Sequence, residues 1–152
     1  MDHAFSNHVS GRYIFGSREW VQAFVDILNS DKEYESAARG WEDPIILAIT
    51  SLPPPVKEHF KTEQVAVWLD LYHGKCRGFE ILSKADEKEA PIVIMGSYDV
   101  MKKVALGRLS PTVAVMTGQL KVKGNVAKLL SNAAASSAFV NAIKKVPTEF
   151  LA

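Results

Sequence analysis

The feature that most constrains the fold is a pair of adjacent β-strand patterns joined by a tight turn. Residues 64–72 alternate, with valine or leucine at every odd position, so their apolar side chains share one face of a strand. His73-Gly74-Lys75 then predicts a hairpin turn, and residues 76–82 return as a second strand. Strands joined in this way are antiparallel and need further elements to bury their apolar face.

Three further segments have strand character. Residues 45–50 are short, rich in β-branched side chains and bounded by prolines. Residues 91–95 form a fourth apolar run, and residues 120–123 alternate apolar side chains with lysines. Together with the hairpin, these segments predict a five-stranded, largely antiparallel sheet.

Helical periodicity occurs on both sides of the strand segments. Ser17 caps a predicted amphipathic helix over residues 17–29, and Ser30 with Glu33 predicts a capping box for a second short helix. Residues 1–14 are expected to be an irregular lead-in to a single domain. The later helical segments are 97–105, 110–117 and the region from Asn125 to Pro147, with a break near Asn132. This order predicts the α+β class, with helices on one face of the sheet.

Composition excludes several classes of protein. The 152 residues are 47% apolar and 23% charged, which is typical of a soluble globular chain and not of a disordered one. A single cysteine, Cys76, excludes a disulfide framework. The uncharged stretch 129–143 is too short and too polar for a membrane-spanning helix, and the N-terminus lacks a signal-peptide pattern. The C-terminus is not a peroxisomal signal, so we expect a cytoplasmic protein.

The net charge of +1 conceals an uneven distribution. Residues 1–90 carry a net charge of −5 and residues 91–152 carry +6. If the basic residues share a face, that face favours an anionic partner such as a membrane surface; the other interpretation is an ordinary solvated surface. Nucleic acid is not expected, because this half contains only Tyr98, Phe139 and Phe150 as aromatic residues. The basic residues of this half are Lys102, Lys103, Arg108, Lys121, Lys123, Lys128, Lys144 and Lys145.

The sequence contains few candidates for catalysis. The histidines are His3, His8, His59 and His73, and none has the spacing of a metal-ligand pair. Asp70, His73 and Cys76 have a spacing compatible with an orienting acid, a base and a nucleophile. A hairpin turn would bring these residues together whether or not they react. We therefore predict a non-enzymatic protein with no catalytic residue, no metal site and no cofactor.

Adaptable apolar side chains are concentrated in the second half. Three of the four methionines, Met95, Met101 and Met116, lie there, among short helices punctuated by glycines. Methionine fits irregular apolar spaces, so this pattern is compatible with a cavity for an apolar ligand. Filling of an ordinary core is the other interpretation of the same residues.

Three strings in this half resemble the C-terminal core of sterol carrier protein type two domains. They are residues 96–99 (GSYD), 107–111 (GRLSP) and 114–125 (AVMTGQLKVKGN). That core commonly contains a helix, a glycine, a Pro-x-x-Ala-x-Met-x-Gly-Lys segment and a Leu-Lys-Val-Lys-Gly-Asp segment. Gln119 replaces the common lysine and Asn125 the common aspartate, although Asn125 can still cap a helix. The resemblance covers about residues 15–145 and includes features of microbial single-domain members: Phe15-Gly16-Ser17, Glu19-Trp20, Tyr34 and Trp41.

The resemblance implies a fold and a function. It implies a five-stranded sheet covered on one face by helices, with an apolar tunnel between the layers. It also implies noncovalent binding or transfer of fatty acids, fatty acyl-CoAs, sterols or isoprenoid lipids, without a reaction. The expected ligand-lining residues are Met95, Met101, Val104, Val113, Met116, Leu120, Leu129, Leu130, Phe139 and Ile143. Trp20 and Phe24 either close the other side or belong to the core. The residues expected to hold an anionic head group or to meet a membrane are Lys121, Lys123, Lys128, Lys144 and Lys145.

Three other functions remain open at this point. The domain could be an accessory scaffold for a lipid-modifying enzyme, with lipid as a structural filler. It could be a small enzyme with Cys76 as nucleophile, or a closed domain that acts through its basic face. An exposed surface formed by Trp68 and Tyr72 would favour a homodimer.

Overall fold

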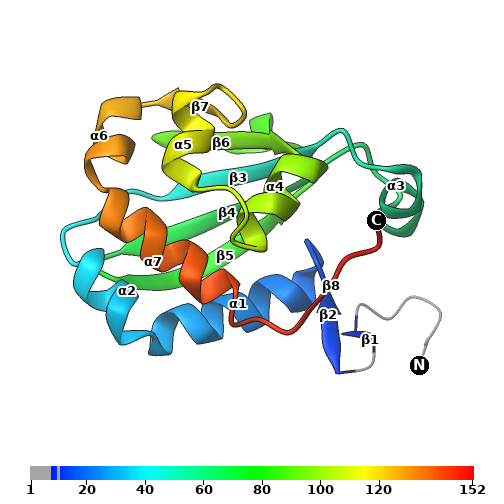
Figure 1. Cartoon of the computed structure of the whole chain (residues 1–152), viewed down its shortest axis with the longest axis horizontal. Coiled ribbons are helices and arrows are strands. Elements are labelled where there is room, and N and C mark those ends of the chain that lie inside the picture. The colour runs from blue at the N-terminus through cyan, green and yellow to red at the C-terminus, as the bar shows by residue number, and fades with distance from the viewer. Residues whose placement is uncertain (1–7, 10) are drawn as a thin grey trace.

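A five-stranded sheet forms the centre of the computed structural model, which describes residues 8, 9 and 11–152 (Figure 1). Its strands lie in the order β5-β4-β3-β6-β7, and every neighbouring pair is antiparallel except β3 and β6. The strands are β3 (Ile45–Thr50), β4 (Val65–Tyr72), β5 (Lys75–Leu82), β6 (Ile92–Ser97) and β7 (Lys121–Gly124). The predicted five-stranded, largely antiparallel sheet is confirmed.

The turn between β4 and β5 is as tight as the sequence predicts. His73 and Gly74 both adopt positive φ angles, 50° and 79°, as a two-residue hairpin turn requires. Gly74 is also needed for close packing, because a Cβ atom there would lie 2.6 Å from the carbonyl oxygen of Glu35. This contact holds the hairpin against α2 (Lys32–Ala37).

Most helices cover one face of the sheet (Figure 1). Side-chain caps predicted from the sequence are present at Ser17, Ser97, Ser110 and Asn125, each accepting a hydrogen bond from a backbone N–H three residues later. The helices on this face are α1 (Arg18–Ser30), α2, α4 (Tyr98–Ala105), α5 (Pro111–Met116), α6 (Val126–Ser131) and α7 (Ala133–Ile143). The α+β class with an asymmetric helical layer is therefore confirmed.

The start of α2 differs from the prediction. Asp31 is the cap, and its carboxylate accepts a hydrogen bond from the backbone N–H of Tyr34 at 2.9 Å. Ser30 still belongs to α1, where its hydroxyl group donates to the carbonyl oxygen of Asp26. The capping box expected from Ser30 and Glu33 is wrong because the two helices are separated by Asp31 alone.

Two ordered segments were not predicted. Residues 54–60 form α3 (Pro54–Phe60), in which Pro54 takes the first helical position, where a missing N–H costs nothing. His59 lies on this helix. The expected irregular lead-in is also partly ordered, because β2 (Arg12–Ile14) pairs with β1 (His8–Val9) and with β8 (Thr148–Glu149). His3 lies outside the described residues.

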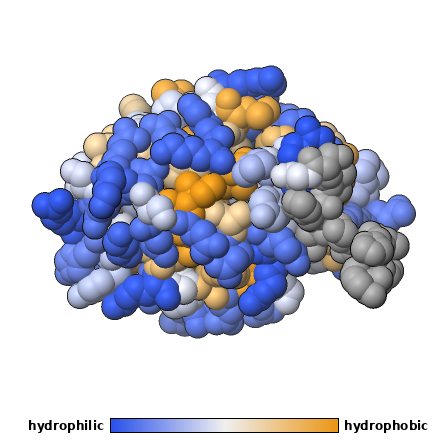
Figure 2. Space-filling view, turned by 90° about the horizontal axis from the view of Figure 1, so that it is seen from below, coloured by the Kyte–Doolittle hydropathy of each residue, from blue (hydrophilic) through white to orange (hydrophobic). Residues whose placement is uncertain are grey.

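The other face of the sheet has a thin cover. Ile46 and Ala48 are fully buried there, beneath the segment between β5 and β6 that contains η2 (Ala85–Glu87). Cations of the same chain lie over two aromatic rings on this face: Lys88 lies 4.6 Å from the ring of Trp68, and Arg77 lies 4.0 Å from the ring of Tyr72. Figure 2 shows a different side of the molecule, seen from below Figure 1, where α1 lies; the surface there is mostly polar around a small central apolar patch.

Candidate functional site

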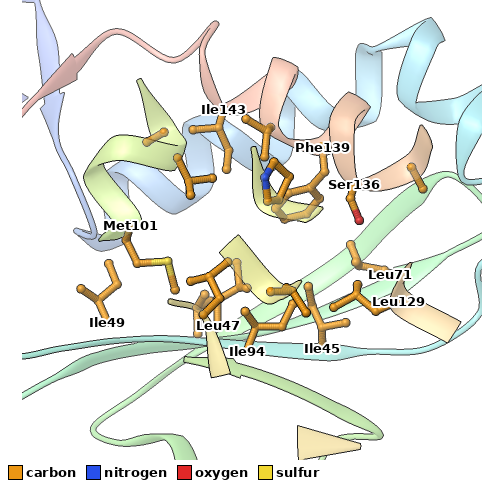
Figure 3. Close-up of a pocket in the computed structure, with 18 of the residues that line it drawn as sticks. Ile45, Leu47, Ile49, Leu71, Ile94, Met101, Leu129, Ser136, Phe139 and Ile143 are labelled. Carbon is orange, nitrogen blue, oxygen red and sulfur yellow. The ribbon is translucent and has the colours of Figure 1, made fainter. Parts of the chain in front are cut away.

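An apolar cavity lies between the sheet and its helical layer. Its volume is about 170 Å³, and its wall includes residues of the sheet, α1, α2, α4, α5, α6 and α7. Figure 3 shows side chains from the sheet and from the helices pointing toward one another across this space. The helices therefore do not close completely onto the strands beneath them.

The floor of the cavity follows from the alternation of the strands. Ile45, Leu47 and Ile49 of β3 point toward the helices and line the cavity, whereas Ile46 and Ala48 point to the opposite face. The neighbouring strands contribute in the same way, because paired residues of adjacent strands share a face. Their side chains at the cavity include Val65, Val67, Leu71, Ile81 and Ile94.

The roof is formed mainly by α7. Phe139 and Ile143 reach down from this helix, one turn apart, while the small residue Ala135 leaves space beneath its first turns. α5 contributes Thr112 and Val115 from its inner side. α6 has no fully buried residue, so it covers its end of the cavity only loosely.

The chemistry of the wall is apolar and uncharged. Among the described residues, none of those that line the cavity carries a charge. Two polar side chains of the wall donate to backbone carbonyl oxygens within the protein. The indole N–H of Trp41 donates to the carbonyl oxygen of Asp43 at 2.7 Å, and the side-chain amide of Asn132 donates to the carbonyl oxygen of Lys128 at 2.8 Å. Such a wall favours a hydrocarbon chain and disfavours an ionised group.

Seven of the ten predicted lining residues border this cavity. They are Met101, Val104, Leu120, Leu129, Leu130, Phe139 and Ile143. Trp20 also lines it, whereas Phe24 lies deeper in the core, 2% exposed and stacked on the Trp20 ring at 5.6 Å between centroids. Whether these residues bind a ligand stays a prediction.

The other three predicted lining residues lie elsewhere. Met95 follows Ile94 along β6, so its side chain points to the opposite face of the sheet, where it packs near Ala48. Val113 and Met116 lie on the outer side of α5 and are 48% and 72% exposed. The prediction named Val113 and Met116 of α5, but the side of this helix that faces the cavity carries Thr112 and Val115.

The sequence prediction missed strand residues of the wall and several helix residues, among them Val115 and Ala135. The odd positions of β3 and β4 supply much of the floor, but only β4 alternates in the sequence, because residues 45–49 are apolar at every position. The predicted lining residues all come from the second half of the chain, so neither strand was included. The alternation identifies the buried face, but it does not show that a gap separates this face from the helices.

The five lysines expected at an anionic surface fall into two groups. Lys128 and Lys145 form ion pairs, at 2.6 Å with Asp43 and at 2.8 Å with Asp31. The second pair holds the pKa of the Asp31 carboxyl below its usual value and raises the pKa of Lys145. The other three of the five, Lys121, Lys123 and Lys144, are exposed, and the structure records no ion pair for them among the described residues.

The three residues considered for catalysis do not form a relay. His73 contacts the carbonyl oxygen of Arg39 and the carboxylate of Glu42, and Asp70 pairs with Arg77. The thiol of Cys76 donates to the Gly78 carbonyl oxygen. Burial raises the pKa of the Cys76 thiol, which lowers its reactivity as a nucleophile. Their arrangement is that of a hairpin with its own structural contacts.

Comparison with protein families gives a clear assignment. The model of the SCP-2 sterol transfer family matches residues 24–136. The chain belongs to the SCP-2 sterol transfer family. This matched region contains β3 to β7 and most of the cavity wall, so the family assignment and the cavity concern the same part of the molecule.

Solved structures of SCP-2 proteins support the assignment. A crystal structure of sterol carrier protein 2 is 34% identical, covers 87% of this chain and 98% of its own, and has a TM-score of 0.74. A solution structure described as a possible sterol carrier protein from Thermus thermophilus is 35% identical, covers 95% and 96%, and has a TM-score of 0.77. Sterol carrier protein 2 from Yarrowia lipolytica, at 22% identity, 92% and 98% coverage and a TM-score of 0.57, shares the fold.

Two further findings concern curated relatives and membrane-spanning helices. A search of curated proteins found no match. Within the described part of the chain, no helix has both the length and the apolar character that crossing a bilayer requires.

Proposed function

We propose that this chain binds a single lipid molecule noncovalently in the cavity and carries it between membranes. The observation that carries the proposal is the cavity itself, an apolar space between the sheet and its helices with no charged residue in its described wall. Membership of a lipid-transfer family supports the same function. Candidate ligands are fatty acids, fatty acyl-CoAs, sterol-like lipids and isoprenoids, with any large charged head group outside.

The size of the cavity sets the length of chain that it accepts. One water-sized group needs about 10–15 Å³ of such space. A cavity of about 170 Å³ therefore accommodates roughly a dozen methylene-sized groups. Each buried methylene contributes about 0.8 kcal/mol, so a chain of roughly ten methylenes contributes about 8 kcal/mol, from which the costs of association are subtracted.

The binding proposal is tested first by native mass spectrometry of the purified protein, with extraction of any bound lipid. We expect a bound fatty acid, isoprenoid or related lipid. A bare mass that also fails to shift with added fatty acid, acyl-CoA or quinone would contradict the proposal. That result would favour the accessory scaffold or the closed domain with a basic face.

A pair of variants on α7 links binding to this cavity. Ala135 lines the cavity, whereas its neighbour Ala134 is exposed. Ala135→Leu places extra volume in the ligand space and should lower lipid affinity at least tenfold, while Ala134→Leu should leave it unchanged. Equal affinities for both variants in a lipid titration would show that the ligand binds elsewhere.

Transfer requires contact with a membrane, and we assign this contact to the exposed lysines. Lys121, Lys123 and Lys144 are available to anionic lipid head groups, and each basic residue near such a surface contributes about 1 kcal/mol. The double variant Lys121→Gln, Lys123→Gln should therefore weaken binding to vesicles that contain phosphatidylglycerol. Lys84→Gln, on the loop after β5, is the matched control and should bind as the wild type does.

A further inference from the structure

The cavity wall contains a buried tyrosine with a free hydroxyl group. Tyr34 of α2 is 2% exposed and lines the cavity. Its backbone N–H is held by Asp31, but its hydroxyl group has no hydrogen-bond partner among the described residues. Among the described residues, no fully buried side-chain oxygen lacks a hydrogen-bond partner, so the Tyr34 hydroxyl keeps some accessible surface, at which a ligand in the cavity can bond to it.

A second hydroxyl group lies at the same end of the cavity. Figure 3 shows the oxygen of Ser136 pointing from α7 toward the sheet. This hydroxyl also lacks a hydrogen-bond partner within the described part of the chain. Phe139 follows one helical turn later, and its ring lies 6.1 Å from the Tyr34 ring, measured between centroids. Ser136 and Tyr34 therefore both belong to the part of the cavity that Phe139 borders.

The surroundings of these hydroxyl groups are electrically neutral. None of the lining residues that the structure describes is charged, and the nearby cations Lys128 and Lys145 are held by Asp43 and Asp31. Burial raises the pKa of Tyr34, so its hydroxyl group remains protonated and able to donate. Neutral donors in an apolar wall suit a neutral oxygen atom and do not compensate the burial of a full charge.

We propose that Tyr34 and Ser136 bind an uncharged oxygen atom, a hydroxyl or carbonyl group, at the buried end of the lipid. This inference rests on the proposed lipid-binding function and adds a ligand class and an orientation to it. The uncharged oxygen of the lipid lies in the part of the cavity that Phe139 borders, and an ionised carboxylate stays in solvent. Tyr34 donates to the ligand oxygen, and Ser136 either donates or accepts.

Ten-carbon probes separate this contact from general apolar binding. We would measure the affinities of decan-1-ol, decane and decanoate for the wild type and for Tyr34→Phe. The substitution removes one hydrogen bond, so the affinity for decan-1-ol should fall about five- to tenfold. The affinities for decane and decanoate should not change, because neither presents an uncharged oxygen to Tyr34. Ser136→Ala should cause a smaller selective loss.

Matched controls lie nearby. Tyr98 is equally buried, at 3% exposed, but lies outside the cavity lining, so Tyr98→Phe should not alter the ratio of alcohol to alkane affinity. Ser137 is the exposed neighbour of Ser136, and Ser137→Ala should have no effect. Tyr34→Phe should not lower the denaturation midpoint, because the hydroxyl group has no protein partner to lose.

The outcomes distinguish this inference from the proposed function. Equal losses for decan-1-ol and decane in Tyr34→Phe would overturn the hydrogen bond while leaving lipid binding intact. A selective loss of decanoate affinity would show that a carboxylate reaches Tyr34 and would overturn the preference for an uncharged group. Failure of all three probes to bind the wild type would overturn both the inference and the proposed function.

Discussion

The two ends of the helical layer are built differently, although both border the same cavity. α1 carries five fully buried apolar side chains, including Trp20, Phe24 and Leu28. α5 buries only Ala114, and α6 buries no residue completely. α1 therefore acts as a fixed frame, and α5 with α6 acts as a thin cover. A lipid exchanges with least disruption through the thin cover, because less apolar contact must be broken there.

Capping shows the same contrast. The Ser17 side chain that caps α1 is 1% exposed and accepts a hydrogen bond from the backbone N–H of Trp20 at 3.1 Å. Asn125, which caps α6, is exposed to solvent. Water competes for the second hydrogen bond but not for the first. The start of α6 is therefore expected to open more readily than the start of α1.

Phe24→Ala tests the frame and should have the largest effect. Phe24 is 2% exposed and contacts the rings of Trp20 and Phe139 at 5.6 and 4.9 Å between centroids. Truncation should lower the free energy of unfolding by about 3–5 kcal/mol, because it leaves a hole that the packed helix cannot fill. Urea denaturation gives this value. A loss no greater than that of Leu130→Ala would contradict the distinction between frame and cover.

Asp31→Ala tests the junction between α1 and α2. Asp31 caps α2 and pairs with Lys145, so its loss should cost about 1–2 kcal/mol at pH 7. The pKa of this carboxyl is lowered in the folded state, so its contribution is present above the unfolded value of about 3.9. The contribution is lost as the pH falls through the lower folded value.

The measurement is chemical denaturation of both proteins across a pH series. The wild type and Asp31→Ala should differ most near neutral pH and converge in strong acid. Asp26→Ala is the control, since Asp26 is an exposed carboxylate on α1, the helix that precedes Asp31. A difference that persists unchanged below the folded pKa would show that the ionised carboxylate is not the source of the stability.

Leu130→Ala tests the cover. Leu130 lines the cavity from α6 and is half-buried, so its truncation should reduce stability by about 1 kcal/mol or less. The rate of lipid dissociation should increase more clearly, because the cover loses an apolar contact with the ligand. Competition kinetics with a fluorescent fatty acid measure this rate. Unchanged dissociation would place the exit path away from α6.

The sequence predicted the frame more accurately than the cover, and the reason is physical. Burial on α1 and alternation on β4 follow directly from helical and strand periodicity, so the amphipathic helix and the apolar face of this strand were predicted. α5 has only six residues, which is too few for periodicity to distinguish its inner side from its outer side. Val113 and Met116 were therefore placed inside although they face outward.

The cavity itself was not visible in the pattern. Periodicity shows that Val67 and Phe139 are apolar and inward-facing, but it does not show whether they touch or leave a gap. The resemblance to a lipid-binding family supplied that expectation. The free hydroxyl group of Tyr34 was also hidden, because Tyr34 fits the apolar face of a short helix equally well as a core residue.

Met116→Glu tests the outside of the cover and should have the smallest effect on stability. Met116 is 72% exposed, so the change in unfolding free energy should stay within about 0.5 kcal/mol. The affinity for decane should also be unchanged, because the side chain points away from the cavity. The chain returns from α5 to the start of β7, where the backbone N–H of Leu120 donates to the Ala114 carbonyl oxygen at 3.0 Å. Binding to phosphatidylglycerol vesicles should therefore fall severalfold, because a carboxylate on α5 opposes the attraction of the β7 lysines to the vesicle. Met116→Leu keeps an apolar side chain and should bind vesicles as the wild type does. If Met116→Glu instead loses decane affinity and keeps vesicle binding, α5 must rotate on lipid uptake, and the thin cover is then a moving part of the binding site.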